Sequence, residues 1–147
     1  MRTRAVSAVP NPWAALKRTD LVLVRAPIAE PGRYYHHHGV IVVRSGLLLE
    51  QERRVLWHEL THHRRGDTSC EGWLAARMEA SVEREAARRA MPTDLLGHLL
   101  ADAVNFEDLV WRCKVPAEWV RFRLDIAHPA ERRIFVAARS RNEAWAA

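Results

Sequence analysis

The chain has 147 residues, a length that suits one compact domain rather than two. Apolar residues make up 48% of it and charged residues 28%, a globular balance that excludes wholesale disorder. The formal net charge of +5 favours an acidic partner, but the arginines are spread along predicted helices, which is typical of solvated helix faces.

The sequence lacks the features of export and of membrane insertion. Residues 1–12 contain no apolar core of a signal peptide, and no apolar run approaches the roughly 20 residues that span a bilayer. The two cysteines, Cys70 and Cys113, have neither CxxC spacing nor the density of a disulfide framework. We therefore expect a soluble, cytoplasmic protein with reduced thiols and no membrane partner.

The first part of the chain carries strand and turn signals. Residues 1–12 are expected to form a flexible tail, and residues 13–18 a short helix capped by Asn11. Apolar, β-branched runs at residues 21–25 and 39–43 predict strands of a small antiparallel sheet with about three strands.

Three adjacent histidines, residues 36–38, precede the second of these runs. In a strand they would alternate between the two faces, so they cannot all bind one ion, and an exposed hairpin is expected. If this strand borders an active-site cleft, it could bind an extended peptide by strand addition, and Tyr34 or Tyr35 could stabilise an oxyanion.

The rest of the chain is predicted to be helical. A helix from about residue 50 should end at Gly66, and residues 73–90 are rich in the strong helix formers Ala, Glu and Arg. Further helices are expected at residues 95–103, 106–112, 116–126 and 130–138, before a tail at residues 139–147. Strands followed by helices indicate an α+β fold.

A metal-binding motif, HExxH, lies in the helix that begins near residue 50. Residues four apart differ by about 40° around a helix, so His58 and His62 can bind one zinc ion from the same face. Glu59 lies on a neighbouring face, where it can act as a general base on a water molecule rather than bind the metal. A catalytic zinc needs a third protein ligand, which the next helix can supply as Glu79 or Glu83. Spacing does not decide between them, and the other glutamate would support a histidine.

The residues around this motif resemble the ImmA/IrrE metallopeptidase family. The resemblance begins with the HExxH helix and its polar turn up to Asp67, and it continues with the family's second signature helix, here EASVEREAARRAMP at residues 79–92. An alignment on the Ala-Ala pair and the closing Met-Pro gives Glu79 the place of the zinc-ligating glutamate.

Two positions in the second helix depart from the family pattern. Val82 stands where the family has alanine, and Glu85 stands where it has an aromatic residue. A competing alignment makes Glu83 the ligand, and the resemblance favours Glu79.

The resemblance implies a zinc-dependent endopeptidase with a minimal zincin-like fold. A small antiparallel sheet would pack on the HExxH helix and the second glutamate helix in a core of residues 13–92, followed by a helical C-terminal part at residues 93–138. The implied zinc ligands are His58, His62 and Glu79, and the implied catalytic residue is Glu59. Relatives cleave a helix-turn-helix repressor, often one encoded nearby, and thereby switch on mobile-element or stress genes.

A second function stays open because residues 105–126 could form a helix-turn-helix. Its second helix carries Arg121 and Arg123, which suit contacts to phosphates or base edges of DNA. The alternative is a DNA- or repressor-binding transcriptional regulator with a structural or vestigial metal site.

Overall fold

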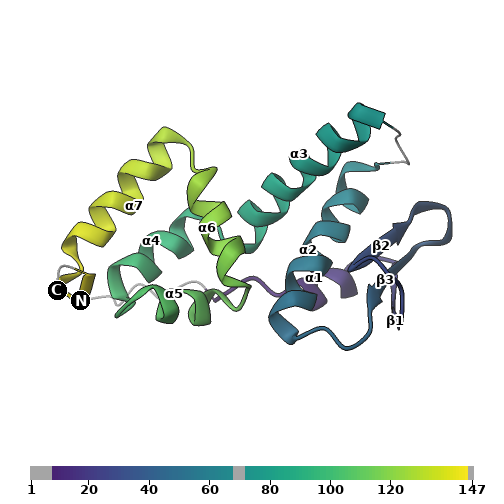
Figure 1. The fold of residues 1–147 in the computed structure, drawn as a ribbon, viewed down its shortest axis with the longest axis horizontal. Coiled ribbons are helices and arrows are strands. Elements are labelled where there is room, and N and C mark those ends of the chain that lie inside the picture. Colours follow the sequence, from purple (N-terminus) through teal and green to yellow (C-terminus); the bar gives the residue numbers. More distant parts are fainter. Residues whose placement is uncertain (1–7, 68–71, 146–147) are drawn as a thin grey trace. The chain divides into compact units, whose positions relative to one another are not determined.

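The computed structural model describes residues 8–67 and 72–145, and the chain divides into two compact units (Figure 1). One unit spans Asn11–Ala90 and contains the sheet and three helices. The helices of the other unit lie within Met91–Ala147, and this unit also includes the described residues before Asn11. Most of the predicted N-terminal tail, residues 1–7, and Cys70 fall outside the described residues. Every helix in the described ranges is too short or too polar to cross a bilayer.

The sheet has three strands with the most apolar one at its centre, and it confirms the predicted α+β class. Strand β1 (Val22–Ala26) runs parallel to β3 (Val40–Arg44), and β2 (Gly32–Tyr35) runs antiparallel to β3 on its other side. Ile41 and Val43 of β3 are completely buried. Since both neighbours pair with β3, β1 and β2 are the edge strands.

The sheet is mixed, so the prediction of an antiparallel sheet is wrong for β1. At the end of β3, the carbonyl of Ala26 accepts a hydrogen bond from the N–H of Ser45 at 2.9 Å, and the N–H of Arg44 donates to the carbonyl of Pro31 at 2.8 Å. Residues 27–31 therefore cross the end of β3, so that β2 pairs with the side of β3 opposite β1 instead of pairing with β1. Apolar patterns predict strands, but they do not encode this strand order.

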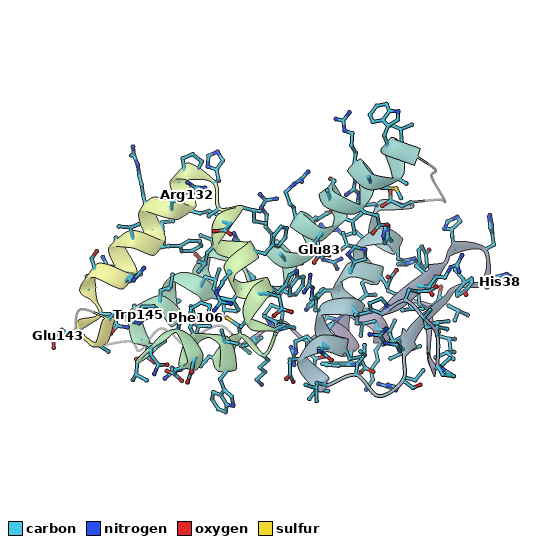
Figure 2. The ribbon with its side chains drawn as sticks, in the orientation of Figure 1. His38, Glu83, Phe106, Arg132, Glu143 and Trp145 are labelled. Carbon is cyan, nitrogen blue, oxygen red and sulfur yellow. The ribbon has the colours of Figure 1, made fainter. Side chains whose placement is uncertain are left out.

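The three histidines lie in an exposed 3₁₀ turn, η1 (His36–His38), that joins the antiparallel strands β2 and β3, so the prediction of an exposed hairpin is confirmed. Gly39 follows with φ 62°, the left-handed region that favours glycine, and turns the chain into β3. His38 lies at the outer end of this connection between β2 and β3 (Figure 2).

The helices of the first unit begin and end where the sequence predicts. Helix α1 (Pro12–Lys17) is capped by the side chain of Asn11, which accepts a backbone N–H of the first turn at 3.1 Å. Helix α2 (Leu49–Arg65) ends at Gly66, whose φ is 69°. Helix α3 (Gly72–Ala90) packs along α2.

Small residues on α3 allow it to approach α2 closely. Its buried residues are Val82, Ala86, Ala87 and Ala90. On α2, Leu56 and Leu60 are buried, and each such leucine contributes about 1.5–3 kcal/mol to folding. This packing sets the distance between the HExxH motif on α2 and the glutamates on α3.

The second unit consists of helices joined by short turns. They are α4 (Thr93–Asp102), α5 (Phe106–Cys113), α6 (Ala117–Asp125), α7 (Pro129–Arg141) and the 3₁₀ turn η2 (Glu143–Trp145). The helix pair α5 and α6 exists as predicted, with Asn105 as the cap of α5 and Lys114 in the left-handed region at φ 59° between the two helices. Cys113 is buried.

One of the two arginines predicted to contact DNA is buried, and that part of the prediction is wrong. Arg123 is 1% exposed, and its guanidinium pairs with Glu131 and donates to the carbonyl of Met91 at 2.9 Å. Arg121 is exposed and lies over the ring of Phe106 at 4.7 Å. The sequence pattern places both arginines on a helix, but it does not reveal that one of them points into the core.

The segment after α7, predicted as a tail from residue 139 onward, is held against the second unit. The Asn142 side-chain amide donates to the carbonyls of Leu100 and Ala103, at 2.9 and 2.7 Å, and the indole of Trp145 also donates to Ala103 at 2.7 Å (Figure 2). Helix α7 itself continues to Arg141.

Candidate metal centre

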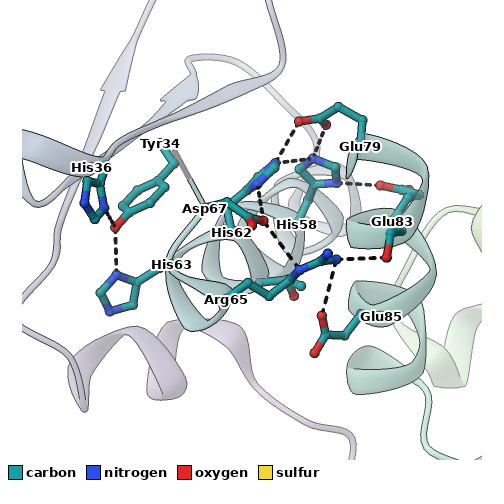
Figure 3. A network of polar contacts seen from close by, with 12 residues as sticks. Tyr34, His36, His58, His62, His63, Arg65, Asp67, Glu79, Glu83 and Glu85 are labelled. Atoms are coloured by element: carbon teal, nitrogen blue, oxygen red, sulfur yellow. Dashed lines mark hydrogen bonds and ion pairs between the residues drawn. The ribbon is translucent and has the colours of Figure 1, made fainter. Parts of the chain in front are cut away.

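The imidazoles of His58 and His62 converge from successive turns of α2 (Figure 3). Their Nε2 atoms lie 3.2 Å apart, and their ring centroids lie 4.9 Å apart. The four-residue spacing therefore brings the two nitrogens together as the sequence predicts.

Glu79 faces this pair from α3. One carboxylate oxygen lies 2.8 Å from Nε2 of His58, and the other lies 2.9 Å from Nε2 of His62. Each of the three residues offers one ligand atom within 4.8 Å of the others. Two imidazole nitrogens and one carboxylate oxygen are the donor set of many catalytic zinc sites, so these residues fit the ion that the family resemblance implies.

The opposite edges of both imidazole rings are held by carboxylates. Nδ1 of His58 lies 2.6 Å from Glu83, and Nδ1 of His62 lies 3.2 Å from Asp67. Each carboxylate fixes the proton on Nδ1 and leaves Nε2 as the free nitrogen, which is the usual support of a metal-binding histidine. Glu83 is itself held by Arg54, which donates to one of its oxygens at 3.0 and 3.2 Å.

Asp67 and Arg54 are parts of the site that sequence reasoning missed. The N–H of Asp67 donates to the carbonyl of His62 at 3.1 Å, because the left-handed Gly66 turns the chain back at the end of α2. This turn brings the Asp67 side chain to the ring of His62. The Gly-Asp pair directly after the helix was the available signal for it.

The carboxylates around the histidines shift the pKa of His58. Burial lowers this pKa, but the hydrogen bond to Glu83 and the charges of Glu59, Glu83 and Glu79 outweigh burial and raise it. The site thus concentrates negative charge around two imidazoles, as a cation-binding centre does.

Glu59 is buried beside the metal-binding group. Only 7% of it is exposed, and burial raises the pKa of its carboxyl to about 7. The charge of His58 opposes this shift, and the charges of Glu79 and Glu83 add to it. Glu59 lines the same pocket as His62 and Glu79.

The pocket is bordered on one side by β2 and η1, including Gly32 and the three histidines, and on the other side by Met78 and Glu79 of α3. The expected condition for strand addition, a strand that borders the cleft, is therefore met by β2. The free edge of β2 therefore runs along the pocket that contains the HExxH residues.

The hydroxyl of Tyr34 is engaged by two histidines rather than pointing at the metal-binding group (Figure 3). It lies 2.9 Å from Nδ1 of His63 and 3.2 Å from Nδ1 of His36. Since a phenol has one proton, it donates to one imidazole and accepts from the other. His63 thus connects α2 to β2.

These residues form a zincin-like arrangement, with two histidines one turn apart on a helix and a glutamate on the next helix facing them. The family model of the IrrE N-terminal-like domain, Peptidase_M78, matches residues 16–125. The chain therefore belongs to this family of metallopeptidases, as its motifs predict. The match continues beyond α3 into α6, further than the motifs that carry the resemblance. No curated protein matches the chain significantly.

Proposed function

We propose that this chain is a zinc-dependent endopeptidase of the HExxH type. The observation that carries the proposal is the convergence of His58, His62 and Glu79 beside the buried Glu59 in one pocket.

His58, His62 and Glu79 would hold the zinc ion, and Glu83 and Asp67 would keep the two imidazoles in place. A zinc ion bound there would supply Lewis acidity, which polarises the scissile carbonyl and favours deprotonation of the attacking water. Glu59 would accept a proton from that water and later return it to the leaving amine.

The free edge of β2 is proposed as the place where the substrate lies in extended form. The hydrogen bond from the Arg44 N–H to the Pro31 carbonyl shows that these two residues form a hydrogen-bonded pair, and the hydrogen-bonded pairs of β2 and β3 then alternate from there. In this antiparallel pairing, Arg33 and Tyr35 direct their backbone N–H and C=O groups to β3, and Gly32 and Tyr34 direct theirs to the free edge. Those backbone groups can bind an added peptide strand along the pocket.

The proposed substrate is a specific protein, a helix-turn-helix repressor encoded close to this protein. The resemblance to the ImmA/IrrE family supports this choice. Cleavage would take place in the cytoplasm, where such repressors bind DNA, and it would derepress mobile-element or stress genes.

The decisive experiment compares wild type with Glu59→Gln. Both proteins are loaded with zinc and incubated with repressors encoded nearby, and new protein termini are mapped by mass spectrometry. We expect one specific cut with wild type and a loss of at least about 100-fold in rate with Glu59→Gln, at unchanged zinc content. Equal cleavage by the two proteins would refute the mechanism.

The alternative, a transcriptional regulator that binds DNA, has less support. Arg123 is buried and cannot reach DNA, so the idea depends on the exposed Arg121. It predicts that the protein binds duplex DNA and that this affinity falls steeply as the salt concentration rises. The affinity should also fall in Arg121→Ala and should not change when a chelator removes the metal.

A further inference from the structure

Strand β2 runs alongside helix α2, and two of its residues lie opposite α2 residues at matching intervals. The two residues of β2 whose side-chain positions face α2 are Gly32 and Tyr34. Gly32 lies opposite Val55 and Glu59, and the hydroxyl of Tyr34 lies 2.9 Å from Nδ1 of His63. Two strand residues span about 6.8 Å and four helical residues span about 6 Å, so the two contacts are in step along both elements.

Gly32 comes so close to α2 that no side chain fits there. A Cβ atom at this position would lie 2.3 Å from Cγ1 of Val55, far inside van der Waals contact, and 3.4 Å from both Cγ and Oε1 of Glu59. The edge strand therefore lies close to α2 at Val55, and a Cβ atom at this position would be in ordinary van der Waals range of Glu59. A larger residue would have to move the strand or the helix side chains.

The carboxylate of Glu59 differs from that of Glu83 in how it is held. Among the residues that the structure describes, no group donates a hydrogen bond to its carboxylate. By contrast, the neighbouring carboxylate of Glu83 is held by Arg54 and His58. The close approach of β2 at Gly32 borders the part of the pocket in which the Glu59 side chain lies.

We propose that Gly32 is a positioning residue of the reaction, and this inference rests on the proposed function. Its missing side chain lets the edge that would bind the substrate approach α2 beside Glu59, which sets the distance between the base and the bound peptide. One turn after Glu59 along α2, the contact between Tyr34 and His63 keeps β2 in the same alignment with α2.

The test uses the full zinc-loaded chain as Gly32→Ala, Val55→Ala and the double variant. Gly97→Ala is the matched control, because a Cβ at this helical glycine would meet only Cγ2 of Ile134, at an ordinary 3.4 Å. The probe is a proteome-derived peptide library, followed by the best-cleaved peptide for kcat and KM. Zinc content and hydrogen exchange of residues 32–35 are measured alongside.

We expect Gly32→Ala to retain zinc and to lose about 100-fold in kcat, with a smaller change in KM, because a shift of the base by about 1 Å misaligns it. Amides of residues 32–35 should exchange faster. Removing the Val55 methyl groups relieves the closest contact, so the double variant should recover to within a few-fold of Val55→Ala. Gly97→Ala should match wild type.

The proposal is overturned if Gly32→Ala cleaves like wild type, or if Val55→Ala fails to restore it. If Gly32→Ala alone does not fold, the double variant decides in the same way: activity near that of Val55→Ala supports the proposal, and inactivity with bound zinc overturns it. A wild type that cleaves no peptide would overturn the proposed function together with this inference, whereas an active wild type with an equally active Gly32→Ala would overturn the inference alone.

Discussion

Glu83 and Glu79 contact opposite edges of one imidazole: Glu83 lies 2.6 Å from Nδ1 of His58, and Glu79 lies 2.8 Å from its Nε2. The two glutamates are one turn apart on α3, so the sequence makes them equivalent candidates. Only Glu79 also contacts Nε2 of His62, at 2.9 Å. The geometry therefore distinguishes the two glutamates. Glu79 faces the Nε2 atoms of both histidines, whereas Glu83 contacts Nδ1 of His58.

This difference predicts different effects on metal binding. Glu79→Gln should lose most of the bound zinc, since it removes a charged ligand. Glu83→Gln should keep the site but lower its zinc affinity by about 10–100-fold, because it only weakens the support of His58. Zinc per chain is measured by mass spectrometry after dialysis, and affinity by competition with a chromogenic chelator. The reverse order of the two variants would make Glu83 the ligand.

Asp67 should support His62 in the same way. Asp67→Asn removes the charge that faces Nδ1 of His62 at 3.2 Å, and we expect zinc affinity to fall about 10-fold or more. Glu85→Gln is the matched control, because Arg65 contacts both Asp67 and Glu85, but only Asp67 reaches a histidine. Equal affinities of the two variants would show that the effect passes through Arg65 and not through His62.

Local signals in the sequence were sufficient for the helices and for the two histidines. The helical period brings His58 and His62 together, Gly66 ends α2, and Asn11 caps α1, because each feature depends on neighbours within a few residues. The choice of Glu79 as the third ligand required the family resemblance, since spacing alone left Glu79 and Glu83 equivalent.

Features that depend on distant contacts could not be predicted. The parallel pairing of β1 depends on where residues 27–31 cross the end of β3. Arg123 resembles any other arginine of a solvated helix face until Glu131, on the next helix, provides a counter-charge in the core. The role of Gly32 depends on its distance to Val55, which is separated from it by a strand, a turn and a second strand.

Zinc should stabilise the folded chain against heat. A ligand that binds only the native state at 100 times its dissociation constant adds about 2.7 kcal/mol, which corresponds to a rise of roughly 10–20 °C in the Tm of a unit of this size. Calorimetry with added zinc and with a chelator measures the shift. His62→Ala is the control, and its Tm should change neither with zinc nor with the chelator. A wild-type Tm that stays the same under both conditions would contradict the metal site.

Glu131 should make the second unit sensitive to acid. Burial raises the pKa of its carboxyl, but hydrogen bonds from Arg123, from the Thr93 hydroxyl at 2.6 Å and from the His128 N–H at 3.1 Å outweigh burial and lower it to about 2. The folded-state pKa is thus below the ordinary value of 4.5. The stability that this group contributes is therefore complete above about pH 4.5 and is lost as the pH falls toward 2.

Glu131→Gln removes the charge and leaves Arg123 buried without it. We expect a loss of about 3–5 kcal/mol in the free energy of unfolding at neutral pH, because breaking a buried ion pair from one side leaves an uncompensated charge. The variant should also lose less further stability than wild type between pH 4.5 and 2.5. Chemical unfolding followed by circular dichroism measures both effects, with the exposed Glu107→Gln as control. Since the remaining carboxylates titrate alike in the two proteins, parallel stability curves over this pH range would show that Glu131 has no such role.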